Sequence, residues 1–175
     1  MTDPLPDASP VTAADLAVLH DQLGRPPRGV VDVAARCVCG RPLVVRTAPR
    51  LDDGTPFPTT FYLTAPPAVK AVSTLEASGL MKEMSERLTT DAELAAAYQR
   101  AHEDYLARRA ELGDVPEIDG VSAGGMPTRV KCLHVLVGHS LAVGPGVNPL
   151  GDEALELLAP SWRPDRCSCV AEEAR

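Results

Sequence analysis

Two runs of β-branched residues joined by a short turn constrain the fold of this 175-residue chain more than any other feature. The runs are VVDVAARC, which begins at Val30, and PLVVRTA, which begins at Pro42, and the letters VCGR connect them. This pattern predicts a β-hairpin with Cys37 and Cys39 at its tip. The letters TTFYLT at residues 59–64 predict a third strand, so we expect a small antiparallel sheet over about residues 30–64.

Apolar residues at helical spacing predict helices on both sides of this sheet. Before it, Thr12 and Asp15 form a capping arrangement for a helix that stops at Gly24. After it, helices are expected over APPAVKAVSTLEASG, near MKEMSERL and over TTDAELAAAYQRAHEDYLARRAELG. The last of these is the longest, and Thr90 and Glu93 are expected to form its capping box.

The final helix is predicted over DEALELL, with Asn148 either capping it or facing a cleft. Together these elements predict a single α+β domain over residues 12–160, in which the later helices cover one face of the sheet. Residues 1–11, with three prolines and two aspartates, and residues 161–175 are expected to be tails. Because the chain has few aromatic residues, its core is expected to consist of Val, Leu and Ala.

Charge and hydropathy exclude several classes of protein. A formal net charge of −7 with scattered basic residues argues against a nucleic-acid partner, since such binding needs a concentrated basic face. The chain has no run of about 20 apolar residues that could span a membrane, and its first residues do not resemble a secretory leader. We therefore expect a cytoplasmic protein that binds neither nucleic acid nor membrane.

A loop with the letters PRLDDGTPFPT separates the second and third strands, and its prolines exclude regular structure. Within and just after it, Arg50 could hold an anion in a bidentate manner, Asp53 could orient the anion, and Thr55 and Thr59 offer hydroxyl groups. These four residues are the predicted anion-binding site for a small ligand that carries phosphate or carboxylate. The alternative is that Asp53 only forms a turn with Gly54 and that Arg50 only forms an ion pair.

The five cysteines indicate metal or thiol chemistry. Their number is odd, and Cys37 and Cys39, like Cys167 and Cys169, form a Cys-x-Cys pair, which a disulfide framework explains poorly. Since Cys37 alone completes the ligand set considered next, Cys39 is expected to be structural. Cys167 and Cys169 are expected to be structural or incidental because they lie in the predicted tail.

A cysteine and two histidines interrupt the apolar run KCLHVLVGH, and we predict that Cys132, His134 and His139 bind one zinc ion together with Cys37. Zinc favours thiolate and imidazole ligands, and two of each complete a tetrahedron. Hydropathy alone predicts a helix from about Thr128 to Val143. A straight helix would place Cys132 and His134 ~200° apart, so we expect both in an extended segment and a later helix start.

Two other interpretations of this run remain open. Cys132 could be a buried apolar side chain or a reactive thiol, and the two histidines could be satisfied core or surface residues. His20 and His102, on charged helical faces, are expected to be solvated.

Five motifs, RCVCGRPLVV, PRLDDGTPFPTTFYLT, STLEASG, GGMPTRVKCLHVLVGH and GPGVNPLGDEAL, occur in this order. Over about residues 20–160 the chain resembles the bacterial domain-of-unknown-function family 501. The resemblance implies a small cytoplasmic protein, frequent in actinobacteria and often encoded near a septum-formation initiator and an exopolyphosphatase, which suggests a cell-division protein partner. It assigns no reaction.

The resemblance also marks individual positions. The residues on family motif positions are Cys37, Arg50, Asp53, Gly54, Thr55, Pro56, Glu76, Cys132, His134, His139, Asn148 and Gly151. For Glu76 it suggests a hydrogen bond from a metal-bound histidine, whereas an exposed helical glutamate needs no such role.

We therefore predict a zinc-binding module whose ion is structural or regulatory and which acts through a protein partner or a bound anion. The alternative is a metal- or thiol-dependent hydrolase of a small anionic substrate, whose catalytic residues the sequence does not identify. Coordination separates the two. Four protein ligands indicate a structural ion, and three ligands with water beside Arg50 and Asp53 indicate hydrolysis.

Overall fold

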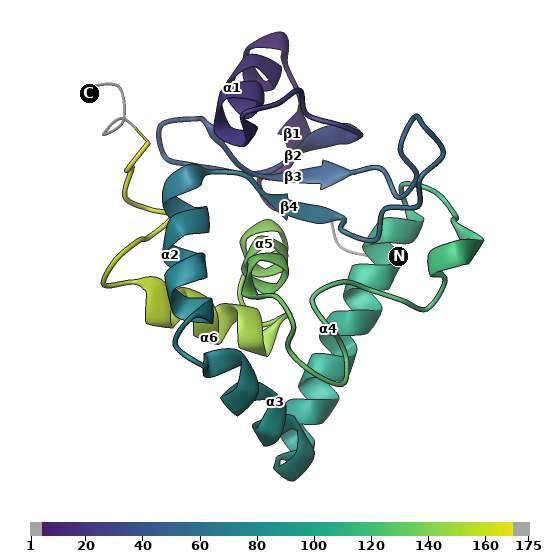
Figure 1. Ribbon diagram of the computed structural model, residues 1–175, viewed down its shortest axis with the longest axis vertical. Coiled ribbons are helices and arrows are strands. Elements are labelled where there is room, and N and C mark those ends of the chain that lie inside the picture. The colour runs from purple at the N-terminus through teal and green to yellow at the C-terminus, as the bar shows by residue number, and fades with distance from the viewer. Residues whose placement is uncertain (1–4, 170–175) are drawn as a thin grey trace.

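The computed structural model describes residues 5–169 and confirms the predicted α+β class. A small twisted sheet lies between the first helix, α1 (Ala13–Leu23), and the other helices (Figure 1). The remaining elements are α2 (Pro66–Glu76), α3 (Leu80–Thr90), α4 (Ala92–Ala110), the 3-10 helix η1 (Pro116–Ile118), α5 (Leu133–Val143) and α6 (Pro149–Leu158). Within residues 5–169, no helix combines the length and the apolar surface that crossing a bilayer requires.

The sheet has four antiparallel strands in the order β1 (Ser9–Pro10), β2 (Val30–Arg36), β3 (Pro42–Thr47) and β4 (Phe61–Leu63). The predicted hairpin is β2–β3, and Cys37 and Cys39 lie in its turn. The prediction of a loose tail over residues 1–11 is wrong at Ser9 and Pro10, which pair with β2. An edge strand tolerates this proline because its missing amide N–H is not needed by a further strand.

Helix α5 is the centre of the molecule, and most of its eleven residues are buried. Two glycines allow it to approach its neighbours closely. A Cβ at Gly138 would lie 3.1 Å from the carbonyl oxygen of Phe61 in β4. A Cβ at Gly151 in α6 would lie 2.4 Å from the carbonyl oxygen of Leu136 and from Ser140 Oγ, a distance that no side chain tolerates. Sheet, α5 and α6 therefore form one continuous core.

Two helix starts differ from a simple reading of the sequence. Helix α4 is the longest element, as expected, but Asp91 caps it by accepting a hydrogen bond from the Leu94 amide, so the predicted Thr90–Glu93 capping box is wrong. Helix α5 begins at Leu133, later than hydropathy indicates, as predicted. Cys132 precedes it in an extended conformation with φ −154° and ψ 111°, as expected, whereas His134 belongs to the first turn of the helix, so the expectation of an extended segment at His134 is wrong.

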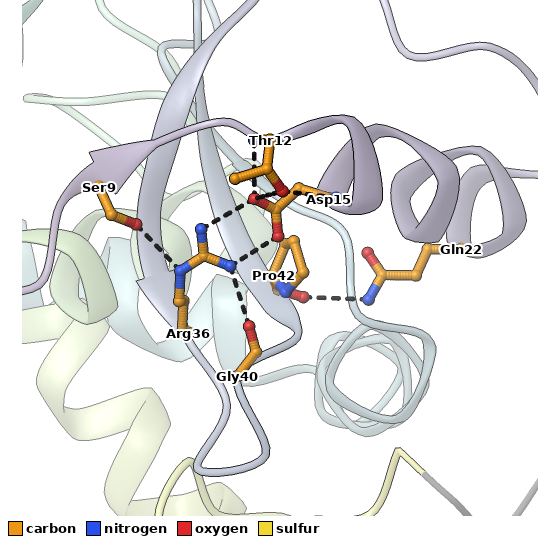
Figure 2. Close-up of polar contacts among 7 residues, drawn as sticks. All are labelled: Ser9, Thr12, Asp15, Gln22, Arg36, Gly40 and Pro42. Atoms are coloured by element: carbon orange, nitrogen blue, oxygen red, sulfur yellow. Dashed lines mark hydrogen bonds and ion pairs between the residues drawn. The ribbon is translucent and has the colours of Figure 1, made fainter.

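A buried ion pair joins α1 to the hairpin next to the cysteine turn (Figure 2). Thr12 and Asp15 form the predicted capping box, and the Asp15 carboxylate also accepts hydrogen bonds from Arg36 at 2.7 and 3.0 Å. The same guanidinium donates to the carbonyl oxygen of Gly40 at 2.9 Å and to Ser9 Oγ at 2.9 Å. Arg36 therefore ties the turn that contains Cys37 and Cys39 to both β1 and α1.

Replacing Asp15 with Asn should lower the free energy of unfolding by about 3 kcal/mol, because Arg36 would lose its buried charged partner. The Arg36 hydrogen bonds, opposed by burial and aided by Thr12, hold the pKa of Asp15 well below its ordinary value of 3.8. The carboxylate therefore stabilises the fold above about pH 4, and this stabilisation is lost as the pH falls further. Urea unfolding at pH 7 and pH 3 should show the difference between wild type and Asp15→Asn shrinking in acid. The same change at exposed Asp21 should have little effect at either pH.

Candidate functional site

Four cysteines from two segments that are far apart in the sequence meet at the β2–β3 turn. The sulfur atoms of Cys37, Cys39, Cys167 and Cys169 all lie within 4.8 Å of one another. A zinc ion with Zn–S bonds of 2.3 Å in tetrahedral geometry separates its sulfur ligands by about 3.8 Å. The donor set and its spacing therefore fit one tetrahedral thiolate-bound ion.

The first pair is positioned by the turn between β2 and β3. The carbonyl oxygen of Cys37 accepts a hydrogen bond from the Gly40 amide at 2.7 Å, and the Cys37 amide donates to the carbonyl oxygen of Arg41 at 2.9 Å. Gly40 adopts φ +88°, a conformation that glycine adopts without strain. The turn thereby directs two sulfur atoms that are two residues apart to one side.

The second pair is positioned by the chain after α6, which turns back toward the hairpin (Figure 1). The Trp162 amide donates to the carbonyl oxygen of Leu158 at 2.8 Å, and the Trp162 side chain is buried in the main core. Arg163 and Asp165 form an ion pair with an N–O distance of 2.5 Å, and the following residues lead directly to Cys167 and Cys169. Both of these cysteines pack against the main core.

Electrostatics at the cluster differ from one thiol to the next. Burial raises the pKa of Cys37 and of Cys169, and neighbouring sulfur atoms raise that of Cys169 further. Burial opposes ionisation of Cys39 as well, but a hydrogen bond from the Arg41 amide and contacts with the other three thiols lower its pKa to about 7. Four mutually close thiols cannot all ionise unless a cation neutralises them.

The structure places the four predicted zinc ligands in three different locations. Cys37 lies in the four-cysteine cluster, whereas Cys132 and His134 lie together beside Glu76. His139 joins neither group. Helix geometry explains the separation, because five residues of helix rotate His139 by about 140° from His134 and advance it by about 7.5 Å.

Sequence reasoning missed Cys39, Cys167 and Cys169 as possible ligands. The available signal was a repeated pattern, since both pairs occur in the form Arg-Cys-x-Cys, at residues 36–39 and 166–169. Spacing by a single residue is shorter than the two to four residues usual in zinc sites, which made the pattern easy to discount.

A second group of possible ligands consists of Glu76, Cys132 and His134, whose ligand atoms also lie within 4.8 Å of one another. His134 Nδ1 lies 3.9 Å from Cys132 Sγ and 3.1 Å from Glu76 Oε1. The contact with Cys132, opposed by burial and aided by Glu76, raises the pKa of His134 to about 9. The site favours a positive charge at this position, and the Glu76 carboxylate contacts the histidine ring directly.

His139 is fully buried, and its two ring nitrogens both have partners. Asn148 Oδ1 caps α6 by accepting a hydrogen bond from the Gly151 amide, so the Asn148 amide nitrogen faces His139 Nδ1 at 3.2 Å and donates to it. His139 Nε2 then carries the proton and donates to Asp104 Oδ2 at 2.8 Å. Burial lowers the pKa of His139, so the neutral ring is a structural part of the core.

The predicted anion site is occupied by contacts within the protein. Arg50 donates to the carbonyl oxygen of Gly54 at 2.7 Å and to Glu117 at 2.6 Å. Asp53 pairs with Arg28 and accepts a hydrogen bond from the Thr55 amide at 3.0 Å, and these contacts, the Thr55 amide first, lower its pKa to about 2. The geometry corresponds to the alternative interpretation of a turn with an ion pair.

Thr59 and His102 also lie in environments that differ from those expected from the sequence. Thr59 lies apart from the Arg50 and Asp53 contacts and lines a cavity beside Cys132 and His134. The prediction that His102 is solvated is wrong, because it is buried and its Nδ1 lies 2.9 Å from Ser122 Oγ. Burial lowers its pKa.

Replacing His139 with Gln should lower the free energy of unfolding by about 2–4 kcal/mol and leave the metal content of the protein unchanged. The change disrupts buried hydrogen bonds to Asp104 and Asn148 but removes no sulfur or nitrogen from either ligand group. Urea unfolding and elemental analysis on the same samples measure the two effects. Loss of metal together with stability would restore His139 as a ligand, and His20→Gln at an exposed histidine should change neither quantity.

Comparison with known proteins places the chain in one family. No curated protein and no solved structure matches it. The family described as "Protein of unknown function (DUF501)" matches residues 33–156, more than half of the chain, a range that contains Cys37, Cys39, Cys132 and His134 and ends before Cys167. The chain therefore belongs to the DUF501 family, whose function is unknown.

Proposed function

We propose that the protein binds one zinc ion through Cys37, Cys39, Cys167 and Cys169, and that this ion fastens the C-terminal segment to the β2–β3 turn. The observation that carries the proposal is the convergence of four sulfur atoms within 4.8 Å of one another. A metal is the simplest partner for this arrangement, since all four thiols are free rather than joined in disulfides.

The ion in this proposal is structural. Four protein ligands complete a tetrahedron and leave no position for water or substrate, which distinguishes structural from catalytic zinc. The ion would close a chain loop of about 130 residues, between the turn and the segment after α6, and long loops gain most from such a cross-link. The reducing conditions of the cytoplasm, where we place the protein, would keep the thiols available as ligands.

Sulfur ligands favour soft or borderline metal ions, and among these a tetrahedral set of four sulfur atoms favours zinc or iron. We favour zinc because the two Cys-x-Cys pairs leave each sulfur with little freedom to move, and zinc needs no change of geometry or redox state to remain bound. Electronic absorption would distinguish the two, since thiolate-bound iron is coloured and zinc is not.

Replacing Cys169 with Ser should remove one equivalent of zinc from protein purified without an affinity tag. Elemental analysis measures the metal, and Cys39→Ser provides a second variant at the exposed end of the site. Ser168→Ala is the matched control, because it changes the residue between two proposed ligands and removes no sulfur. Zinc content equal to wild type in both cysteine variants would contradict the proposal.

The same experiment has a structural readout. If the ion fastens the C-terminal segment, a chelator should make cleavage by trypsin after Arg166 at least tenfold faster, while α5 in the core stays protected. Cleavage that is equally fast with and without zinc would show that the ion does not hold this segment.

A further inference from the structure

Three metal-binding side chains outside the four-cysteine cluster converge at the start of α5. Cys132 is the residue before the helix, His134 lies in its first turn, and Glu76 is the last residue of α2. The separations are 3.9 Å from sulfur to His134 Nδ1 and 3.1 Å from this nitrogen to Glu76 Oε1. All three side chains are partly buried, so the group is shielded from bulk solvent without being sealed.

Hydrogen-bond partners of Nε2, the ring nitrogen that faces away from Cys132, fix the orientation of the His134 ring. Its Nε2 lies 3.2 Å from the carbonyl oxygen of Val69 and 3.3 Å from Ser73 Oγ. A carbonyl oxygen can only accept, so Nε2 carries a proton and Nδ1 is the nitrogen that faces Cys132 and Glu76. Metal-bound histidines commonly donate their other N–H to a backbone carbonyl in this way.

Glu76 is held in a similar manner. Its Oε1 accepts a hydrogen bond from the Leu133 amide at 2.7 Å, at the N-terminus of α5. A carboxylate oxygen, a sulfur atom and a ring nitrogen therefore face one another, and each can offer a lone pair. Such an arrangement needs a proton or a cation among these atoms: the thiol proton of Cys132, a second proton on the histidine, or a metal ion.

The open side of the group faces a cavity of about 520 Å³. Cys132 and His134 form part of its wall, and Glu76 does not, so the carboxylate closes the far side. Much of the remaining wall is apolar, with Phe61 and Val135 among its residues, and Lys70 is the one lysine or arginine in it. A small molecule could therefore reach the group from the cavity and meet a positive charge there.

We propose that Glu76, Cys132 and His134 bind a second zinc ion with three protein ligands, and that its fourth position is open to a small anion from the cavity. The ligand class is a small carboxylate or phosphate compound whose charge is balanced by the metal and by Lys70. Three protein ligands with one open position are the pattern of catalytic zinc, which lowers the pKa of a bound water to about 7. This site is independent of the proposed four-cysteine ion.

The metal content of single variants tests the site. Untagged wild-type protein, stripped of metal and titrated with Co²⁺, should bind two equivalents. Cys132→Ser and Glu76→Gln should each bind one equivalent, and Cys169→Ser should also bind one, but at the other site. Glu76→Gln keeps an oxygen that can accept from the Leu133 amide, so the start of α5 should stay folded, which circular dichroism checks.

Absorption spectra separate the two sites. Cobalt bound by four thiolates should give about four times the charge-transfer intensity of cobalt bound by one, so Cys169→Ser should keep the weaker band and Glu76→Gln the stronger one. A wild-type protein that shows the weaker band and no strong band would overturn the four-cysteine proposal and leave this one standing. Two equivalents that survive in both Cys132→Ser and Glu76→Gln, or a single equivalent already in wild type that Cys169→Ser removes, would overturn the second site.

Azide tests the open position as a probe anion. It should change the weaker cobalt spectrum in wild type and in Cys169→Ser, and it should not change the spectrum of Glu76→Gln. Lys70→Gln should weaken azide binding about two- to fivefold, whereas Lys82→Gln on α3 should not. A weaker spectrum that azide leaves unchanged would overturn the open position.

Rapid alkylation of Cys132 by iodoacetamide at pH 6 in metal-free and metal-treated protein alike would assign the group to a thiolate–imidazolium pair instead.

Discussion

The close packing of α5 between β4 and α6 is the constraint on which the rest of the structure depends. Gly138 lets the helix approach the Phe61 backbone, and Gly151 lets α6 cross it with almost no space between the two backbones. This packing fixes where the helix begins, and so where Cys132 and His134 lie. It also fixes the direction in which α6 ends, and so where the segment with Cys167 and Cys169 returns to the sheet.

The middle of α5 is stabilised by polar contacts as well as by apolar packing. The His139 ring stacks on Phe61 and meets the edge of Tyr105, and its two nitrogens join Asn148 at the start of α6 to Asp104 on α4. Hydrogen bonds from His139 and Arg108 outweigh burial and hold the pKa of Asp104 below its usual range. A histidine with both nitrogens satisfied rigidifies the helix that carries the ligand group at its N-terminus.

Local sequence signals predicted what depends on neighbouring residues. The hairpin, its cysteine turn and the Thr12–Asp15 cap follow from patterns within a few residues. The partners of Cys37 could not be predicted in this way, because they depend on the path of the chain after α6. The sequence paired Cys37 with His139 because thiolate and imidazole suit zinc, but ligand chemistry alone does not reveal which side chains share a helix face.

The two ligand groups differ in a way that suits two roles. Four sulfur atoms, two from the β2–β3 turn and two from the segment after α6, form a closed set beside the ion pair of Arg36 and Asp15, and an ion bound there would only hold segments together. One sulfur, one nitrogen and one oxygen form a smaller set at a helix N-terminus, with the fourth side facing a cavity. Glu76 accepts a hydrogen bond from a backbone amide, and His134 donates one to a backbone carbonyl. This second set is therefore organised before any ion binds. In the roles we propose, an ion at the cysteine cluster would fasten the segment after α6 to the β2–β3 turn, and the mixed group would bind a small ligand.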